Sequence, residues 1–195
     1  MQLNSIRVKL FFVSICCLVL SLSVGCEKTD SDKTPVVSAP PATTFPMPPI
    51  SGKSLSEMGW QLADGQRNNF AQYNGSVLVL DFYATWCMPC RESVPHLIEL
   101  QRRYENDVRV VGLNVGGVDD LTHVSEFAKE LSITYPLGLP DNDLVSLLIT
   151  GPDQIPQTFI FDRAGKLEKR LVGFDKNTVT ELTATVEKIL TTHTD

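Results

Sequence analysis

Hydrophobic and polar positions follow one another along most of the chain in blocks that predict strands and helices. Residues 77–83, Val-Leu-Val-Leu-Asp-Phe-Tyr, form an almost unbroken apolar run, and residues 108–115 form a second one. Such runs are typical of strands buried on both faces of a parallel sheet. Further strands are expected at 158–161 and 167–172, and the turn pair Asp64-Gly65 predicts a hairpin across residues 60–66.

Apolar side chains recur at helical spacing in three other segments. One helix is expected from Cys87 to about Asn106, kinked at Pro95, and a second at 124–131. A third begins at the capping box Thr178-x-x-Glu181 and buries its apolar positions, Val179, Leu182, Val186 and Ile189. The resulting order β-α-β-α-β-β-α predicts an α/β fold, a mixed central sheet with helices on both faces.

The N-terminal part of the chain lacks this alternation. Residues 1–9 carry basic side chains, and residues 10–24 are uncharged and rich in Leu, Val, Ile and Phe. That run makes ~22 Å of helix, which is short of the about 30 Å of a bilayer core. Residues 1–25 are therefore interpreted as a signal peptide, with an uncleaved membrane anchor as the alternative. Residues 26–53, rich in Pro, Ser and Thr, predict a tether to a domain at 54–195.

A cysteine follows directly after the predicted signal peptide. The sequence Leu22-Ser23-Val24-Gly25-Cys26 resembles the bacterial lipobox, although Ser23 stands where a leucine is usual. The resemblance implies that Cys26 is lipidated and becomes the first residue of the mature protein. The protein would then be anchored in the bacterial cell envelope, facing the periplasm or extracytoplasmic space, with the choice of membrane open. An unmodified thiol in a tail is the alternative.

Composition and charge narrow the classes of function. Seventeen basic and 23 acidic side chains give a net charge of −6, so nucleic-acid binding through a basic face is not expected. Besides Cys26, the predicted mature chain contains two cysteines, Cys87 and Cys90. A zinc site would need further ligands, and the three histidines are widely spaced. Covalent haem would need a histidine at Arg91. No metal and no cofactor are expected.

The pair Cys87-Met88-Pro89-Cys90 lies where a buried strand gives way to a helix. The first sulfur would stand at the helix N-terminus, where unpaired N–H groups and the helix dipole stabilise a thiolate. The second sulfur would lie one turn further in and be shielded. This asymmetry predicts Cys87 as the attacking thiol and Cys90 as the resolving thiol. A purely structural disulfide is the alternative.

The segment from Asp81 to Cys90, together with Pro95, resembles a thioredoxin-fold active site. Arg91, Asn114 and the Ile-Pro-Gln-Thr sequence at 155–158 narrow the resemblance to the TlpA/ResA-like branch, over about residues 54–190. That branch comprises extracytoplasmic, membrane-tethered thiol–disulfide oxidoreductases. The resemblance therefore implies a thioredoxin-like fold and redox chemistry at the cysteine pair.

The same resemblance implies roles for individual residues. Pro156 matches the family's cis-proline, which lies beside the dithiol and offers backbone groups to a substrate; an ordinary trans turn proline is the alternative. Asp81 matches a buried carboxylate that moves a proton for the resolving thiol, with an exposed strand-end acid as the alternative. Two positions depart from the pattern. Ser93 stands where the branch often has an acid, and Gly112 stands where thioredoxins have a lysine.

Substrate contacts are expected around the dithiol, from Trp86, Met88, Pro89 and Ile155, although packing alone would also explain Trp86. The resemblance implies exchange with cysteines of exported proteins, as a reductant, including the haem-binding cysteines in cytochrome c maturation, with a membrane thiol transporter as electron donor. The motif itself leaves the direction open. A redox-inert binding or chaperone-like module and a thiol peroxidase are the other classes. A peroxidase would need a Thr-x-x-Cys turn, and the sequence after Thr85 is one residue short of it.

Overall fold

A seven-stranded mixed sheet organises the protein, in the strand order β2-β1-β5-β4-β3-β6-β7. The computed structural model describes residues 52–149 and 154–192; the predicted signal peptide, Cys26 and most of the tether lie outside these ranges. The strands are β1 (Gly59–Leu62), β2 (Arg67–Asn69), β3 (Val77–Tyr83), β4 (Val108–Asn114), β5 (Leu137–Pro140), β6 (Gln157–Phe161) and β7 (Leu167–Val172). At the centre, β3 pairs in parallel with β4 and antiparallel with β6.

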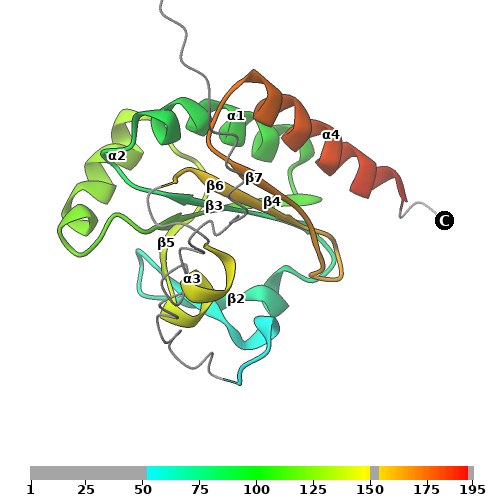
Figure 1. Ribbon diagram of the computed structural model, residues 1–195, viewed down its shortest axis with the longest axis horizontal. Coiled ribbons are helices and arrows are strands. Elements are labelled where there is room, and N and C mark those ends of the chain that lie inside the picture. The colour runs from blue at the N-terminus through cyan, green and yellow to red at the C-terminus, as the bar shows by residue number, and fades with distance from the viewer. Residues whose placement is uncertain (1–51, 150–153, 193–195) are drawn as a thin grey trace, which may run out of the picture. The chain divides into compact units, whose positions relative to one another are not determined.

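Helices cover both faces of this sheet. They are α1 (Met88–Tyr104), α2 (Val124–Glu130), α3 (Asn142–Leu148) and α4 (Lys176–Thr192), with 3-10 turns at Leu55–Glu57, Phe70–Tyr73 and Asp119–His123. Figure 1 shows α1, α2 and α4 on one face and α3 on the other. The predicted α/β architecture is thereby confirmed. Within the ranges that the structure describes, no helix combines the length and apolar composition needed to cross a membrane.

Strand β3 is buried along its whole length, as its apolar run predicts. Successive side chains of a strand point to opposite faces. Leu78, Leu80 and Phe82 belong to the core on the α3 side, whereas Val77 and Val79 pack with residues of α1 and α4. Asp81 shares the face of Val77 and Val79. The carboxyl group of the strand is therefore directed toward the side of the sheet that α1 covers.

Several predicted elements are confirmed and two were not foreseen. The hairpin is present as β1 and β2, and Gly65 in its turn has a φ of 83°. Helix α1 begins at Met88 and continues through Pro95 to Tyr104. Strand β5 and helix α3, which have only four and seven residues, were not predicted from the sequence. Strand β5 joins the hairpin to the sheet, because it pairs with β1 on one side and β4 on the other.

The predicted start of the last helix is wrong. Helix α4 begins at Lys176, so Thr178 lies inside it and does not form a capping box with Glu181. Instead Thr178 N donates to Asp175 Oδ1 at 2.7 Å, and Asp175 N donates to Thr178 Oγ1 at 2.8 Å. The Asp175 carboxylate accepts the bond from Thr178 N as well as a hydroxyl would, which places the N-cap upstream of Thr178. Leu182, Val186 and Ile189 are buried as predicted, and Val179 is half-buried.

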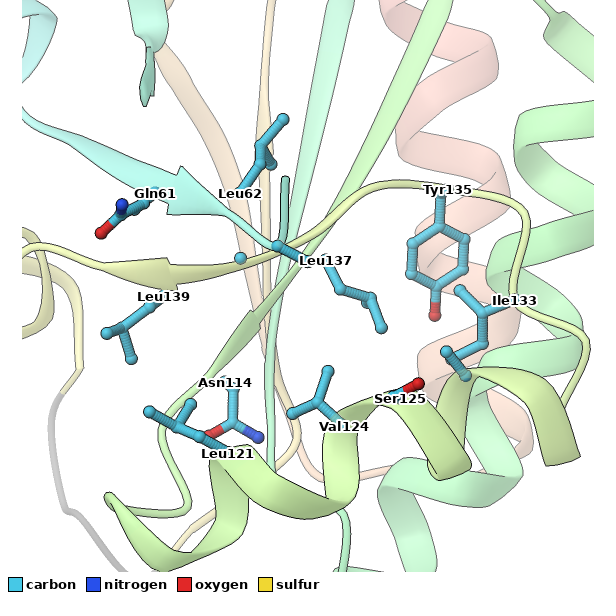
Figure 2. A pocket seen from close by; sticks show the side chains of 13 residues that line it. Gln61, Leu62, Asn114, Leu121, Val124, Ser125, Ile133, Tyr135, Leu137 and Leu139 are labelled. Carbon is cyan, nitrogen blue, oxygen red and sulfur yellow. The ribbon is translucent and has the colours of Figure 1, made fainter. Parts of the chain in front are cut away.

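A cavity remains on the sheet face that α2 covers. It has a volume of about 580 Å³ and lies between α2 and the outer strands β1 and β5 (Figure 2). Its lining is mostly apolar, with Gln61, Asn114, Ser125 and Tyr135 as polar members. Neither cysteine of the Cys87–Cys90 pair lines it. The cavity and the dithiol are therefore separate features of the fold.

Candidate active site

Cys87 and Cys90 lie at the N-terminal end of α1, directly after the loop that follows β3. They form a disulfide with their Cα atoms 5.2 Å apart. Cys87 is the N-cap residue of α1, and Cys90 N donates to Cys87 Sγ at 3.2 Å. Pro89 occupies the first turn, where a helix makes no use of the missing N–H group. In the reduced protein the same N–H group and the helix end would stabilise a thiolate on Cys87.

The two sulfurs differ in their surroundings. Cys90 is 0% exposed and Cys87 is 5% exposed, so Cys87 is the one that a partner can reach. Three predicted contact residues, Trp86, Met88 and Pro89, are exposed around it. A cleft of about 380 Å³ adjoins Trp86 and is lined by charged side chains, among them Arg91, Glu126 and Glu130. The surface next to Cys87 is therefore a mixture of apolar and charged groups.

The predicted cis-proline is confirmed, since the Ile155–Pro156 peptide bond is cis. Cys87 Sγ lies 3.7 Å from the carbonyl oxygen of Ile155, so the segment before β6 stands beside the disulfide. Ile155 itself is half-buried, and Pro156 is buried. The backbone of this segment therefore lies next to the sulfur that a substrate would approach. The part of both residues in substrate binding stays a prediction.

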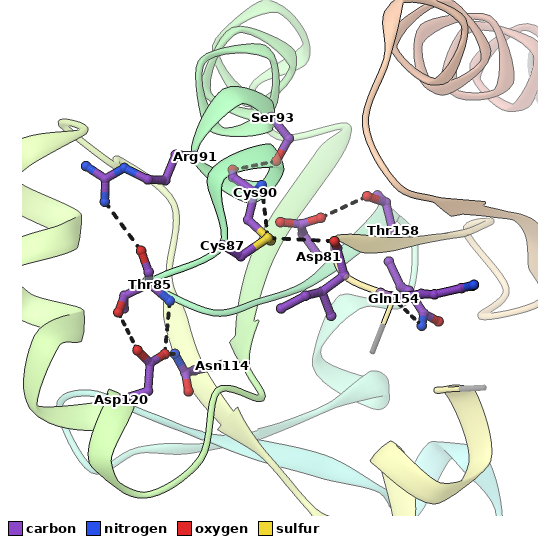
Figure 3. Close-up of a disulfide and its surroundings, with 12 residues drawn as sticks. Asp81, Thr85, Cys87, Cys90, Arg91, Ser93, Asn114, Asp120, Gln154 and Thr158 are labelled. Atoms are coloured by element: carbon purple, nitrogen blue, oxygen red, sulfur yellow. Dashed lines mark hydrogen bonds between the residues drawn. A yellow bond between two sulfur atoms is a disulfide. The ribbon is translucent and has the colours of Figure 1, made fainter. Parts of the chain in front are cut away.

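Asp81 is buried, which removes the alternative of an exposed strand-end acid. Its side chain is 1% exposed, and Thr158 Oγ1 donates to Asp81 Oδ1 at 2.8 Å. Figure 3 shows the carboxyl group pointing toward the two cysteines. Burial raises the pKa of Asp81 to about 7, and the hydrogen bond from Thr158 opposes this rise. Near neutral pH the group can therefore both accept and release a proton.

Gly112 stands directly opposite Asp81 on β4, at the position of the thioredoxin lysine. A Cβ atom there would lie 2.6 Å from Leu137 Cδ2 and 3.2 to 3.3 Å from ring atoms of Tyr83 and Tyr135. Two aromatic rings and a leucine thus fill the space that a lysine side chain would need. The carboxyl group of Asp81 is consequently governed by burial and by its neighbour on β6.

The second departure, Ser93, is buried on the helical turn after Cys90. Its hydroxyl donates to the carbonyl oxygen of Cys90 at 2.8 Å. The position therefore carries a neutral group that is satisfied by the backbone of α1. No three described His, Cys, Asp or Glu side chains come together in a way that could hold a metal ion.

A second buried carboxylate, Asp120, escaped the sequence analysis. It is 4% exposed, and Oδ2 accepts hydrogen bonds from Thr85 N at 3.0 Å and Asn114 Nδ2 at 2.7 Å. Oδ1 accepts a further bond from Thr85 Oγ1 (Figure 3). Burial alone would raise the pKa of Asp120, but these bonds and the nearby His123 outweigh burial and hold the pKa below its ordinary value. Asp120 therefore remains ionised at neutral pH.

Thr85 is held from its other side by Arg91. Arg91 Nη1 donates to the carbonyl oxygen of Thr85 at 3.4 Å. The guanidinium group also pairs with Glu130 and lies over the ring of Phe127, 5.4 Å from its centroid. Both peptide groups of Thr85 are thus fixed two residues before Cys87. The sequence did not predict this contact of Arg91 with Thr85.

Comparisons with known proteins agree with this site. The sequence profile of the AhpC/TSA family matches residues 48–170. The thiol-disulfide oxidoreductase ResA of Geobacillus thermodenitrificans is 32% identical over 111 residues, which are 56% of this chain and 62% of that protein. That match spans less than two thirds of the relative. The thiol-disulfide oxidoreductase ResA of Bacillus thuringiensis is 25% identical over 170 residues, covering 85% of this chain and 88% of the relative.

The fold has solved counterparts as well. The crystal structure of a thiol:disulfide interchange protein of the thioredoxin family from Chlorobium tepidum aligns with a TM-score of 0.58 and 26% identity. The alignment covers 68% of this chain and 92% of that structure. The fold predicted from the resemblance, a thioredoxin-like α/β domain, is therefore confirmed.

Proposed function

The chain belongs to the AhpC/TSA family, and from this we propose that it is a thiol–disulfide oxidoreductase working through Cys87 and Cys90. The observation that carries the proposal is the asymmetry of the pair. Cys87 caps α1 beside the exposed Trp86 and Met88, whereas Cys90 is fully buried one turn further in. Relatives that carry the name thiol-disulfide oxidoreductase support the same activity.

The exchange proceeds in two steps at the cysteine pair. The thiolate of reduced Cys87 attacks one sulfur of a client disulfide; that bond breaks, a mixed disulfide forms, and one client thiolate leaves. The sulfur of Cys90 then attacks Cys87 Sγ and releases the second client thiolate. Two electrons pass from the protein to the client, and the protein ends with the Cys87–Cys90 disulfide seen in the structure.

Asp81 provides the proton acceptor for the second step. Cys90 attacks only as a thiolate, and burial keeps solvent away from its sulfur. The carboxylate of Asp81 takes the thiol proton, and with a pKa of about 7 it is available for this near neutral pH. Replacement of Asp81 by Asn should therefore slow release of Cys87 from a mixed disulfide while leaving the fold intact. An unchanged release rate near neutral pH would remove Asp81 from the mechanism.

The clients are cysteines of exported proteins, which the protein reduces, among them the haem-binding cysteines of cytochrome c. A membrane thiol transporter returns the electrons. The signal-like residues 1–25 support export, and the relatives' name, thiol-disulfide oxidoreductase, supports exchange with cysteines. The direction is tested by trapping the Cys87/Cys90 redox state in cells with and without a candidate donor. A reductant stays mainly as the dithiol when the donor is present and becomes the disulfide when it is removed.

Anchoring rests on Cys26, the lipidated first residue of the mature protein. The lipobox-like residues before it support this proposal. Metabolic labelling with palmitate should mark the wild-type protein and not Cys26→Ser, which should also remain unprocessed at this site. Labelling that persists in Cys26→Ser would contradict the anchor without touching the redox proposal.

Insulin reduction tests the activity itself. The protein should accelerate precipitation of insulin by dithiothreitol, and Cys87→Ser and Cys90→Ser should not. Consumption of hydrogen peroxide, measured in parallel with the same three proteins, separates a thiol peroxidase. Peroxide consumption without insulin reduction would assign the peroxidase class. Loss of both activities would leave a redox-inert binding module.

A further inference from the structure

A proton that reaches Asp81 has to leave it again before the next exchange. The carboxyl group is 1% exposed, so bulk water does not take the proton directly. Four titratable groups face it: Tyr83 on β3, Tyr135 before β5, and the cysteine pair at the start of α1. Burial raises the pKa of both tyrosines above the ordinary value of that side chain, so both stay protonated near neutral pH. Among the described residues, the hydrogen bond to the Asp81 carboxyl comes from Thr158 and not from either tyrosine.

Thr158 offers the remaining contact. It stands directly opposite Asp81 in the antiparallel pairing of β3 with β6, and its hydroxyl donates to Asp81 Oδ1 at 2.8 Å. A hydroxyl has one hydrogen to donate and lone pairs with which to accept. When Asp81 is protonated, the carboxyl O–H can therefore donate to Thr158 Oγ1, while the hydroxyl of Thr158 turns to another acceptor. The geometry allows a proton to enter on one side of this oxygen and leave on the other.

Thr158 is also one of the residues that line a narrow cleft between α1, α4 and the end of β7. Its volume is about 20 Å³, and Ser93 and the exposed His96 also line it. A single water needs roughly 10–15 Å³ of such space and two or more polar partners. The hydroxyl groups of Thr158 and Ser93 supply such partners. Of the described residues that line the cleft, only His96 carries an ionisable side chain. The cleft thus connects Thr158 with a solvent-exposed side chain.

We propose that Thr158 relays the proton between Asp81 and water in this cleft. Neutral Asp81 passes its proton to Thr158 Oγ1, and Thr158 passes its own hydroxyl proton to the water, which hands it to solvent. Asp81 returns to the carboxylate and Thr158 to a neutral hydroxyl, so one proton moves and no electron does. The purpose of the relay rests on the proposed function, in which Asp81 must be deprotonated once per cycle.

The relay can be measured without a client. The infrared band of the protonated Asp81 carboxyl, identified by its absence in Asp81→Asn, should disappear after a jump from about pH 6 to about pH 8. In Thr158→Val, which keeps the shape and removes the hydroxyl, this loss should be about a hundredfold slower, at the low end of the range for positioned proton-transfer groups. Thr158→Ser should restore the rate. Thr180→Val, at an exposed threonine of α4, is the matched control and should match the wild type.

Two readouts separate a relay from a mere effect on the pKa. Loss of the hydrogen bond from Thr158 also raises the pKa of Asp81, which moves the midpoint of the band along the pH axis. A shifted midpoint with an unchanged rate would overturn the relay. If Thr158→Val does not fold, Thr158→Ala is compared with Thr158→Ser in the same way. Failure of the proposed function is seen separately, as absent insulin reduction by a wild-type protein whose Asp81 still exchanges its proton rapidly.

Discussion

Two buried carboxylates flank the dithiol, and they differ in charge although they are almost equally buried. Asp81 is 1% exposed and Asp120 is 4% exposed. Within the described part of the chain, the side chain of Asp81 accepts one hydrogen bond, from Thr158, and burial raises its pKa to about 7. Asp120 accepts three, and its pKa lies below the ordinary value. At Asp120 the three hydrogen bonds outweigh the effect of burial, whereas at Asp81 a single hydrogen bond leaves burial dominant.

The difference assigns each group a task that the other could not perform. A carboxyl poised near neutrality changes its protonation state easily, which suits proton transfer with Cys90. A permanently ionised carboxylate is a strong acceptor, which suits Asp120 for holding the backbone of Thr85 ahead of Cys87. Asp81 and the cysteines thus form the chemical side of the site. Asp120 with Thr85 and Asn114 forms the positioning side. Four experiments test this contrast.

The largest effect is expected from the two sulfurs themselves. Both Cys87→Ser and Cys90→Ser should abolish turnover, but only Cys90→Ser should accumulate client proteins as mixed disulfides, because Cys87 remains to attack and nothing resolves the adduct. Each variant, purified from cells and separated on non-reducing gels, gives the answer. If Cys87→Ser collected the adducts and Cys90→Ser did not, Cys90 would be the attacking thiol and Cys87 the resolving one.

The next effect concerns stability, through Asp81. The unfolded group titrates near 3.8 and the folded group near 7, so the folded state retains a proton that the unfolded state has lost between these values. Stability therefore falls as pH rises through this window, by roughly 4 kcal/mol at about 1.4 kcal/mol per pH unit. Asp81→Asn lacks the loss and should be more stable than the wild type by up to that amount above about pH 7. Urea unfolding at pH values inside and above the window measures this.

Asp120→Asn provides the comparison for that measurement. The pKa of Asp120 is depressed, so its contribution is present at neutral pH and lost as pH falls through the folded pKa. Asp120→Asn should therefore leave the fall of stability between about pH 4 and 7 in place. If the slope disappeared in Asp120→Asn and persisted in Asp81→Asn, the two carboxylates would have been assigned the wrong way round.

The chemical side could be predicted from the sequence and the positioning side could not. Asp81 lies in the apolar run of β3, and the cysteines lie at the start of the helical pattern of α1. The roles of Asp81 and Pro156 came from the resemblance to a thioredoxin-fold active site. Asp120 lies in a short 3-10 turn after β4, six residues beyond Asn114. Its partners Thr85 and Asn114 come from two other parts of the chain. A hydrogen-bond network between loops has no periodicity, and only the pairing of β3 with β4 brings it together.

The same reason explains the elements that were missed. Strand β5 contains Gly138 and Pro140, both uncommon within strands, and it exists because β1 and β4 pair with it on either side. Helix α3 is too short to show a clear period. Tertiary pairing stabilises both elements. The early start of α4 arose differently, because Asp175 and Thr178 form a cap in an order that the Thr-x-x-Glu pattern does not describe.

On the positioning side, Asp120→Ala should cost about 3 kcal/mol of unfolding free energy. It leaves buried donors on Thr85 and Asn114 without their acceptor, each worth about 1–3 kcal/mol and not fully additive. Urea unfolding at neutral pH of the oxidised protein measures the loss. Glu126→Ala, at an exposed acid on α2, is the control and should change stability by less than about 0.5 kcal/mol. Equal losses of unfolding free energy in the two variants would mean that the hydrogen bonds of Asp120 do not stabilise the fold.

The smallest effect separates the two sides by a single methyl group. A Cβ at Gly116 would lie 2.2 Å from Asp120 Oδ2, and three hydrogen bonds hold that carboxylate in place. A Cβ at Gly112 would lie 2.6 Å from Leu137 Cδ2, at the end of a side chain. A leucine end can rotate aside, but Asp120 can move only by breaking its bonds to Thr85 and Asn114. Gly116→Ala should therefore lower the free energy of unfolding by about 2 kcal/mol and Gly112→Ala by about 1 kcal/mol, both within the range for overpacked sites.

Gly116→Ala should in addition slow attack by Cys87 on a client disulfide, because it loosens Thr85, whereas Gly112→Ala should leave that rate unchanged. Urea unfolding and stopped-flow mixed-disulfide formation give both numbers, and a slower attack in Gly112→Ala alone would place the positioning role on the side of Asp81.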